Sequence, residues 1–276
     1  MAYRFRQGMK VLTIGDGDFS FSLALARIMC KGSNEEGSEV VATSYESLET
    51  LKKVYPSIQE TIDEMLQLNV KIYYEVDATN LNDTLSLKSG NYHRIVWNFP
   101  CTAIANGQDG QNEQMKENQM LVKKFVKQCV HYLHPSGEIQ FMHKTKPPYD
   151  QWGLERVAVE EDGVWSEKDP CPLEYKGRVV FDKCLLPPYT PRKALNKKSF
   201  PYHDACLFVF GWKTQKDTDE NGSGKSYPST IPVEDEAQDE TEKDIMPVSN
   251  AMIDEIRNLH LMFGSYQDRK HRKLRK

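Results

Sequence analysis

The stretch KVLTIGDGDFSFSLALA, residues 10–26, decides the fold of this chain. Residues 11–14 are apolar and largely β-branched, and they end at a glycine turn, which predicts a short buried parallel strand. The turn itself reads Gly-Asp-Gly-Asp at residues 15–18, and apolar residues then recur at helical spacing over residues 21–28. A strand, a tight glycine loop and a helix in this order form the entry unit of a nucleotide-binding α/β fold.

The glycine loop indicates that a ligand is bound there. Glycine tolerates positive φ and has no Cβ, so the chain can approach a ligand closely, and the helix start presents unpaired N–H groups. The third glycine of the dinucleotide motif G-x-G-x-x-G is Ser20 here, and Asp16 and Asp18 would oppose a pyrophosphate. Carboxylates suit a ligand with ammonium and hydroxyl groups, of which S-adenosylmethionine (SAM) is the common one. An ordinary turn without a ligand is the alternative.

Length and composition bound the class of protein. The chain has 276 residues, enough for one large domain with a tail or for two small domains. It contains no run of eighteen apolar residues, and its first ten residues lack the apolar segment of a signal peptide, so we expect a soluble protein that is not secreted. Six scattered cysteines, without a C-x-x-C pair or zinc spacing, favour a reduced compartment and argue against a structural metal.

The net charge of −4 conceals an asymmetry. Residues 217–244 hold ten acidic and two basic residues, so the rest of the chain carries 34 basic against 30 acidic side chains. This mildly basic remainder permits a nucleic acid partner. The polar, acidic composition of residues 214–246 predicts a disordered linker.

The C-terminal residues 247–276 predict a helix followed by a basic tail. The helix has one apolar face, which can dock on the domain or on another protein. The last ten residues include six Lys or Arg, which form either a solvated end or an arm for nuclear targeting or RNA contact.

Strand and helix signals alternate along the rest of the chain. Apolar runs predict strands, and amphipathic runs predict helices, at the following positions: strands at residues 40–43, 70–76, 94–98, 138–142, 177–186 and 205–212, and helices at residues 57–68 and 117–133. Repeated β-α units predict a doubly wound, mostly parallel sheet. Seven strands with an antiparallel last strand are typical of SAM-dependent methyltransferases. We therefore expect residues 1–213 to form a Rossmann-like α/β domain of this kind.

Two acidic side chains follow predicted strands. Glu46 comes just after the second strand, where a carboxylate can accept hydrogen bonds from ribose hydroxyls. Asp77 ends the third strand, where it can accept from an adenine amino group while the backbone N–H of Ala78 reaches a ring nitrogen. The alternatives are a favourable charge at a helix start for Glu46 and a helix cap for Asp77.

The segment Asn98-Phe99-Pro100 ends the fourth strand, beside the glycine loop in a doubly wound sheet. It is similar to the Asn-Pro-Pro-aromatic signature of methyltransferases that act on planar nitrogen. An amide oxygen and the next carbonyl can accept from a ring N–H, while an aromatic ring stacks on the base. Phe19 and Phe99 can also lie against a sulfonium cation.

A basic and aromatic loop joins the last two predicted strands, at residues 187–203. Tyr189 can stack on a base, and Arg192 and Lys193 can meet phosphates, so we expect this loop to contact RNA. The alternative is a structural hairpin.

Five segments together resemble the yeast-type 25S rRNA (uridine-N3)-methyltransferase family, over about residues 10–159. The segments are GDGDFSF at 15–21, TSYES at 43–47, VDAT at 76–79, NFP at 98–100 and Asn118-Gln119. The resemblance implies a Rossmann-like enzyme that uses SAM to methylate N3 of a uridine in large-subunit rRNA. It also implies a nuclear or nucleolar location, with the cytoplasm as the alternative.

The resemblance implies a role for each matching residue. The resemblance assigns the cofactor's amino acid portion to the loop residues Gly15, Asp16, Gly17 and Asp18. It assigns the ribose to Glu46 and the adenine to Asp77 and Ala78. The target base is assigned to Asn98, Phe99 and Pro100. Asp16 replaces the Glu that the family usually has in its loop, and Cys101 replaces the His that usually follows Asn-Phe-Pro.

Proton handling is the chemical question that the sequence leaves open. Uridine N3–H is not ionised at neutral pH, and Asp18, His93 and His143 are the nearest titratable candidates in the sequence, none of them assigned as the base. The change at Cys101 makes an inactive methyltransferase-like RNA-binding or ribosome-assembly module the main alternative. A nicotinamide-dependent oxidoreductase is less consistent with Ser20 and with Glu46, which lies nearly thirty residues beyond Gly17.

Overall fold

A computed structural model describes the fold. It describes residues 5–30, 37–83, 91–102, 115–161, 163–193, 195–196 and 198–213. The predicted linker at 214–246 and the predicted helix and basic tail at 247–276 lie outside the described residues. The predicted domain boundary at residue 213 stays a prediction.

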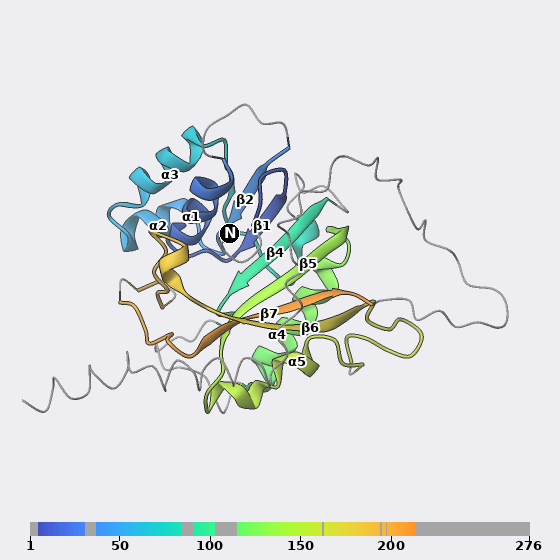
Figure 1. Ribbon diagram of the computed structural model, residues 1–276. Helices are drawn as coiled ribbons and strands as arrows, with labels where there is room; N and C mark the ends of the chain where they lie inside the picture. Colours follow the sequence, from blue (N-terminus) through green and yellow to red (C-terminus); the bar gives the residue numbers. More distant parts are fainter. Residues whose placement is uncertain are drawn as a thin grey trace, which may run out of the picture.

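Seven strands form one sheet with the order β3-β2-β1-β4-β5-β7-β6 (Figure 1). The strands are β1 (Lys10–Ile14), β2 (Glu39–Thr43), β3 (Lys71–Tyr73), β4 (Tyr92–Asn98), β5 (Leu133–Lys144), β6 (Leu173–Val180) and β7 (Ala205–Trp212). Strands β1 to β5 pair in parallel, and β7 is antiparallel to both β5 and β6. The predicted doubly wound sheet with an antiparallel last strand is confirmed.

Helices cover both faces of the sheet. Figure 1 shows α1, α2 and α3 grouped on one side of the sheet and α4 and α5 on the other. The helices and short 3₁₀ turns are α1 (Ser20–Met29), α2 (Leu48–Val54), α3 (Ile58–Gln67), η2 (Leu81–Asp83), α4 (Met115–Cys129), η3 (Tyr149–Trp152), α5 (Leu154–Val157) and η4 (Lys183–Leu185). None of the described helices is long and apolar enough to cross a membrane.

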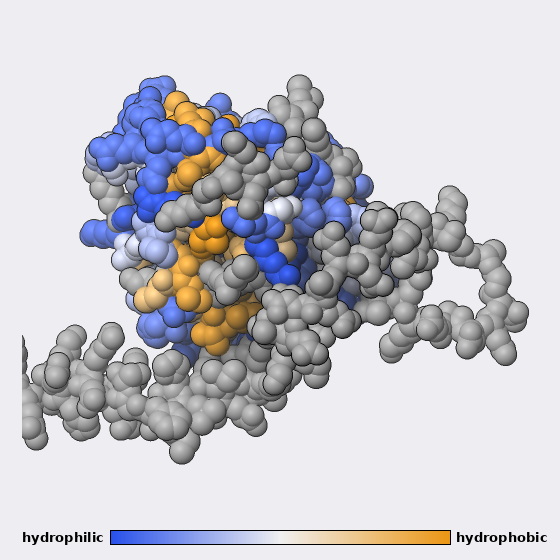
Figure 2. Space-filling view, turned by 45° about the horizontal axis from the view of Figure 1, so that its top comes forward, coloured by the Kyte–Doolittle hydropathy of each residue, from blue (hydrophilic) through white to orange (hydrophobic). Residues whose placement is uncertain are grey.

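The core consists of two apolar clusters, one on each face of the sheet. Successive strand residues point to opposite faces, so Val11 joins the cluster beneath α1 and α3, whereas Leu12 joins the cluster beneath α4. Phe21 anchors the first cluster and Phe125 the second, and both are almost fully buried. Apolar side chains also reach the surface on the face drawn in Figure 2.

The structure corrects the predicted end of one helix and of one strand. The predicted helix at residues 117–133 extends too far, because α4 ends at Cys129 and β5 already begins at Leu133, with a register shift against β4. Gly137 permits the irregular pairing, since a Cβ there would lie 2.7 Å from the carbonyl oxygen of Tyr92. Strand β6 ends at Val180, six residues before the end of the predicted strand.

Candidate active site

The glycine loop lies at the carboxyl end of β1, where parallel α/β sheets bind ligands. Gly15 has φ +61°, and a Cβ there would lie 3.1 Å from the indole nitrogen of Trp97. The backbone N–H of Asp16 donates to the carbonyl oxygen of Thr43, 2.9 Å away, which ties the loop to β2. The conformation and the close approach both require glycine at position 15, so the loop has the tight shape that the sequence predicted.

Asp16 faces the start of α1. Its Oδ2 accepts hydrogen bonds from the backbone N–H of Ser22 at 2.8 Å and from the Ser22 hydroxyl at 2.6 Å. Burial, with a further contribution from Asp18, raises the pKa of Asp16 to about 7. Phe19 occupies the N-cap position without a side-chain cap, so Asp16 supplies an acceptor that the helix start would otherwise lack. The structure gives this carboxyl group a structural partner within the chain.

Asp18 is held from two sides. Its Oδ1 accepts from the backbone N–H and the hydroxyl of Ser20, and its Oδ2 accepts from the Nε of Arg192 at 2.6 Å. This ion pair joins residues 174 positions apart, one from the predicted cofactor loop and one from the predicted RNA loop. Tyr55, at the end of α2, interacts with the backbone of Asn196 in the same loop. The 187–203 loop therefore lies against the glycine loop.

Backbone strain gathers at the carboxyl edge of the sheet. Phe19, Glu75 and Phe99 follow β1, β3 and β4, and each has a positive φ between 51° and 57°. This conformation costs a non-glycine residue about 1–3 kcal/mol, and such residues cluster at active sites and ligand clamps. The side chain of Phe19 is fully buried and packs edge-on against Tyr74, so Phe19 is a packing residue and does not form an exposed wall for a cation.

Glu46 and Asp77 occupy the positions that the sequence predicted, after β2 and β3. The carboxylate of Glu46 has no hydrogen-bond partner among the described residues, and its backbone carbonyl accepts from Glu75 N–H. Asp77 is exposed, and its Oδ1 accepts from the backbone N–H of Thr79 at 2.7 Å and from the hydroxyl at 2.8 Å. Asp77 thus stabilises a turn and does not cap a helix, the alternative considered for it, since η2 begins only at Leu81; no hydrogen bond from the described residues reaches its second oxygen. Ala78 is buried beside it.

Asn98, Phe99 and Pro100 form the other half of the edge. The backbone N–H of Phe99 donates to the carbonyl oxygen of Met142 at 2.7 Å, which fixes the segment against β5. The Oδ1 of Asn98 is buried and accepts no hydrogen bond within the described part of the chain. An unpaired buried polar atom costs about 1–3 kcal/mol, and each one requires an explanation. A bound molecule that donates a hydrogen bond would provide it.

Asn118 is a site residue whose role the sequence did not define. It is fully buried on α4, and its Oδ1 accepts from the backbone N–H of Thr102 at 2.7 Å. Asn118 therefore holds the chain that leaves the Asn-Phe-Pro segment. Cys101, between them, is exposed, and its thiol donates to the Thr102 carbonyl oxygen.

The three residues predicted to bind RNA have different surroundings in the structure. Tyr189 is 6% exposed, and its ring lies 5.1 Å from that of Phe21, so it is a core residue and the expectation that it stacks on RNA does not fit. Arg192 pairs with Asp18, whereas Lys193 is half-buried on the same loop. Phe200, further along the loop, packs edge-on against Phe99 at 4.8 Å.

Lys144 and Tyr149 complete the edge, and the sequence reasoning missed both. The ammonium group of Lys144 donates to the Tyr149 hydroxyl at 3.2 Å and lies 5.0 Å from the centre of the Phe200 ring. A basic residue directly after a central strand, followed by KPPY, was the signal that could have revealed this group.

The two histidines considered as candidates for the proton acceptor, neither of them assigned that role, are poorly placed. His93 lies near the amino end of β4, accepts from the backbone N–H of Lys10 and stacks on His134, so it is on the opposite edge of the sheet. His143 is almost fully buried, and burial lowers its pKa to about 4. Among the described residues, no cluster of His, Cys, Asp and Glu could hold a metal ion.

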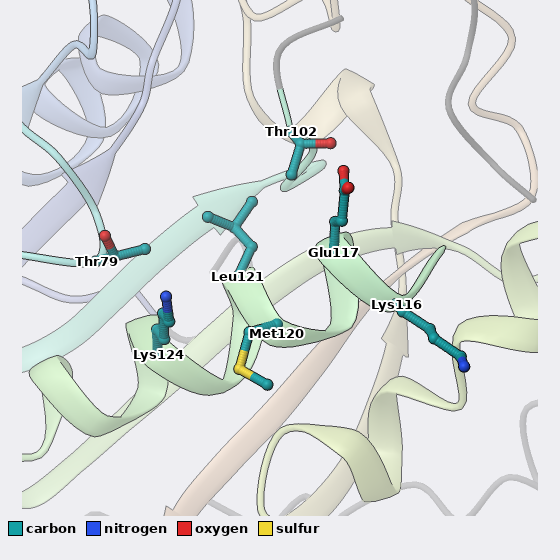
Figure 3. Close-up of a pocket in the computed structure, with 7 residues that line it drawn as sticks. All are labelled: Thr79, Thr102, Lys116, Glu117, Met120, Leu121 and Lys124. Atoms are coloured by element: carbon teal, nitrogen blue, oxygen red, sulfur yellow. The ribbon is translucent and has the colours of Figure 1, made fainter. Parts of the chain in front are cut away.

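A groove of about 430 Å³ lies between α4 and the loops after β3 and β4 (Figure 3). Leu121 points into the groove from α4, between Thr79 and Thr102. Its lining residues are Thr79, Thr102, Lys116, Glu117, Met120, Leu121 and Lys124. Because Thr79 donates a hydrogen bond to Asp77, the groove adjoins the residues assigned to adenine.

The chain has the fold of a Rossmann-like SAM-dependent methyltransferase, the class to which its family match assigns it. More narrowly, the chain belongs to the BMT5-like family, described as rRNA (uridine-N3-)-methyltransferase BTM5-like, which matches residues 12–193. The resemblance predicted from the sequence is confirmed. The cofactor of this class is SAM, and the tight glycine loop, the available oxygen of Asp77 and the unpaired Glu46 carboxylate fit it.

Individual relatives differ in length from this chain. Uncharacterized protein At4g26485 of Arabidopsis thaliana is 31% identical over 206 residues, which cover 73% of this chain and 91% of that protein. Heavy metal-associated isoprenylated plant protein 41 of Arabidopsis thaliana is 27% identical over 184 residues, and the match covers 67% of this chain but a third (33%) of that relative.

A yeast enzyme and a solved structure are more distant. The 25S rRNA (uridine(2634)-N(3))-methyltransferase of Saccharomyces cerevisiae is 28% identical over 141 residues, covering 44% of this chain and 40% of the enzyme. A predicted O-methyltransferase from Agrobacterium tumefaciens aligns with a TM-score of 0.42 at 12% identity, covering 76% of each chain. That structural likeness is too weak to carry the assignment, which rests on the family match.

Proposed function

We propose that this protein methylates N3 of a uridine in large-subunit rRNA, with SAM as the methyl donor. The observation that carries the proposal is the buried, unpaired Oδ1 of Asn98, next to Phe99 in a strained conformation. Uracil is planar and has one ring N–H on its pairing edge. The amide oxygen can accept from that N–H while the ring of Phe99 lies against the base.

The two halves of the edge have separate tasks in this proposal. SAM, when bound, supplies an electrophilic methyl group on a sulfonium centre. The glycine loop and Asp18 bind the amino acid portion, Glu46 the ribose hydroxyls, and Asp77 with Ala78 the adenine. Asn98, Phe99 and Pro100 orient the base, because transfer to a planar nitrogen depends on holding the reactants in near-attack geometry.

RNA contact is assigned to the exposed side of the 187–203 loop. Lys193 and Lys198 supply positive charge there, and Arg192 adds to it when its bond to Asp18 opens. The target uridine has to leave its stacked or paired position before it reaches Phe99. A pre-ribosomal RNA substrate implies a nucleolar location. We also expect the helix predicted within residues 247–276 to bind a protein partner.

The alternative function is a methyltransferase-like module without turnover. It is favoured by Cys101, because an exposed thiol that donates to a neighbouring carbonyl replaces the histidine usual at this position. Methyl transfer, measured together with SAM binding, separates the two functions.

The test is methyl transfer by the full chain from isotope-labelled SAM to large-subunit rRNA transcripts, read as N3-methyluridine by nucleoside mass spectrometry. Calorimetry with SAM and with S-adenosylhomocysteine runs in parallel. Asn98→Ala is the active-site variant, and Asn91→Ala is its matched control, because Asn91 precedes the same strand at its opposite end.

We expect N3-methyluridine with the wild type and the control and none with Asn98→Ala. Binding of SAM without transfer to any RNA would favour the inactive module. Absence of SAM binding would overturn the assigned cofactor site.

A further inference from the structure

Lys144 presents a positive charge at the edge of the sheet that holds the Asn-Phe-Pro segment. Met142 of β5 is the Cα partner of Asn98 in β4, and Lys144 lies two residues beyond Met142 on the same face of the sheet. The side chains of Asn98 and Lys144 are therefore directed to the same face of the sheet at its carboxyl edge. Lys144 is half-buried and ends the strand.

The surroundings of the ammonium group are aromatic. Its Nζ lies 4.3 Å from the centre of the Tyr149 ring and 5.0 Å from that of Phe200. It forms no ion pair with a carboxylate within the described part of the chain, and it donates a hydrogen bond to the Tyr149 hydroxyl. Aromatic faces attract a cation but do not neutralise it, so this charge is available to a ligand.

Phe200 connects this charge to the assigned base site. Its ring packs edge-on against Phe99 at 4.8 Å and also contacts the ammonium group of Lys144. Phe99 and the Lys144 ammonium group therefore share Phe200 as a neighbour, which brings the cation close to the assigned base site. The other ionisable groups nearby are Tyr149, the buried His143 and Asp204, whose backbone carbonyl accepts from Thr145.

We propose that Lys144 donates a hydrogen bond to a carbonyl oxygen of the target uracil and stabilises the anion formed when N3 loses its proton. This inference rests on the proposed function. In the step, the N3–H bond breaks, the proton passes to solvent water, and the electron pair stays on N3 and spreads onto O2 and O4. An ammonium group beside one of these oxygens lowers the energy of that anion.

The size of the effect follows from comparable sites. Removing one donor that faces a developing oxyanion lowers kcat about 10²- to 10³-fold. A lysine that only contacts RNA phosphate would instead raise KM for RNA and leave kcat unchanged. The two roles therefore separate in steady-state kinetics.

The experiment compares Lys144→Met, Lys144→Gln and Lys144→Arg with the matched control Lys146→Met, a lysine two residues further on that is exposed. Methyl transfer by the full chain is measured as kcat and KM from pH 6 to 9, on RNA with uridine or 5-fluorouridine at the target position. Fluorine makes the N3–H more acidic, so the modified base needs less help. Thermal melting and SAM calorimetry verify that each variant is folded.

We expect Lys144→Met and Lys144→Gln to lower kcat about 100-fold with little change in KM or SAM affinity. Their rate should rise with pH over the whole range, 5-fluorouridine should restore much of it, and Lys144→Arg should retain part. An unchanged kcat, or a defect confined to KM, would overturn the role of Lys144 while leaving the proposed function intact. A wild type that binds RNA and SAM but methylates no uridine would overturn both.

Discussion

The cofactor side of the edge, formed by residues after β1, β2 and β3, differs from the base side, formed by residues at the ends of β4 and β5. On the cofactor side, three carboxylates already accept hydrogen bonds within the chain, Asp16 from Ser22, Asp18 from Arg192 and Asp77 from Thr79, whereas that of Glu46 has no partner among the described residues. On the base side, Asn98 and Lys144 leave an acceptor and a cation unsatisfied. The chain thus satisfies most of the carboxylates on the cofactor side by itself, whereas on the base side it leaves a buried acceptor and a cation without a charged partner among the described residues.

The largest expected effect on activity is at Asn98, on the base side. Asn98→Ala should lower kcat by about 10²-fold or more, because the base loses its orienting acceptor. It should leave the melting temperature unchanged or raise it, since the variant removes a buried unpaired oxygen that costs about 1–3 kcal/mol. Both are measured on the same preparation, by methyl transfer and by calorimetric melting. A marked loss of stability would mean that Asn98 is a structural residue.

The next effect concerns Asp77. Asp77→Ala should weaken SAM binding about 10- to 100-fold, the range expected when a charged hydrogen-bond acceptor is lost. Thr79→Val is the matched control, because it removes the hydroxyl that bonds to Asp77 but keeps the carboxylate. Calorimetric titration with SAM measures both. Equal losses in the two variants would show that only the turn matters.

A smaller effect is expected at the ion pair that joins the two predicted loops. Arg192→Ala frees Oδ2 of Asp18 for the cofactor's ammonium group, so SAM should bind up to about fivefold more tightly, which matches the ~1 kcal/mol of a half-exposed pair. RNA binding should weaken at the same time. Lys198→Ala, on the same loop, should weaken RNA binding without changing SAM affinity.

These affinities are measured by calorimetry for SAM and by filter binding for RNA. Weaker SAM binding by Arg192→Ala would mean that the pair prepares Asp18 for the cofactor and does not compete with it.

The smallest effect on activity should come from Asp16, whose signature is in stability. Its pKa is raised from 3.8 to about 7, so between about pH 4 and 7 the folded chain binds more protons than the unfolded chain. The free energy of unfolding must therefore fall as the pH rises through this window. Asp16→Asn should flatten that slope in urea unfolding at pH 4.5, 5.5 and 6.5. An identical slope in both proteins would assign the pH dependence to other groups.

Much of the fold could be predicted because its signals are local. The order of strands and helices follows from apolar periodicity and from the glycine turn at Gly15, whose positive φ and contact with Trp97 tolerate no side chain. The bulge at Gly137 was missed, because a proline-serine-glycine triplet ends helices as readily as it interrupts a strand. The position of Asn98 at the end of β4 likewise followed from counting strands.

Side-chain partners could not be predicted, because they join residues far apart in the chain. Tyr189 reads as an exposed aromatic residue in a basic loop, yet its ring packs against Phe21 in the core. Arg192 reads as an RNA contact, yet it reaches Asp18. Lys144 was not predicted as a site residue, because its importance depends on Phe200 and Phe99, which the fold brings close to it.

The sequence by itself determined the fold class and the family, and it placed the candidate site at the carboxyl edge of the sheet, since strand order and glycine turns are written in short stretches. Only the tertiary structure decided which polar groups at that edge are satisfied. A hydrogen bond such as that between Asp18 and Arg192 depends on where distant segments meet. The same packing left the amide oxygen of Asn98 buried and unpaired, which is the physical basis for placing the target base there.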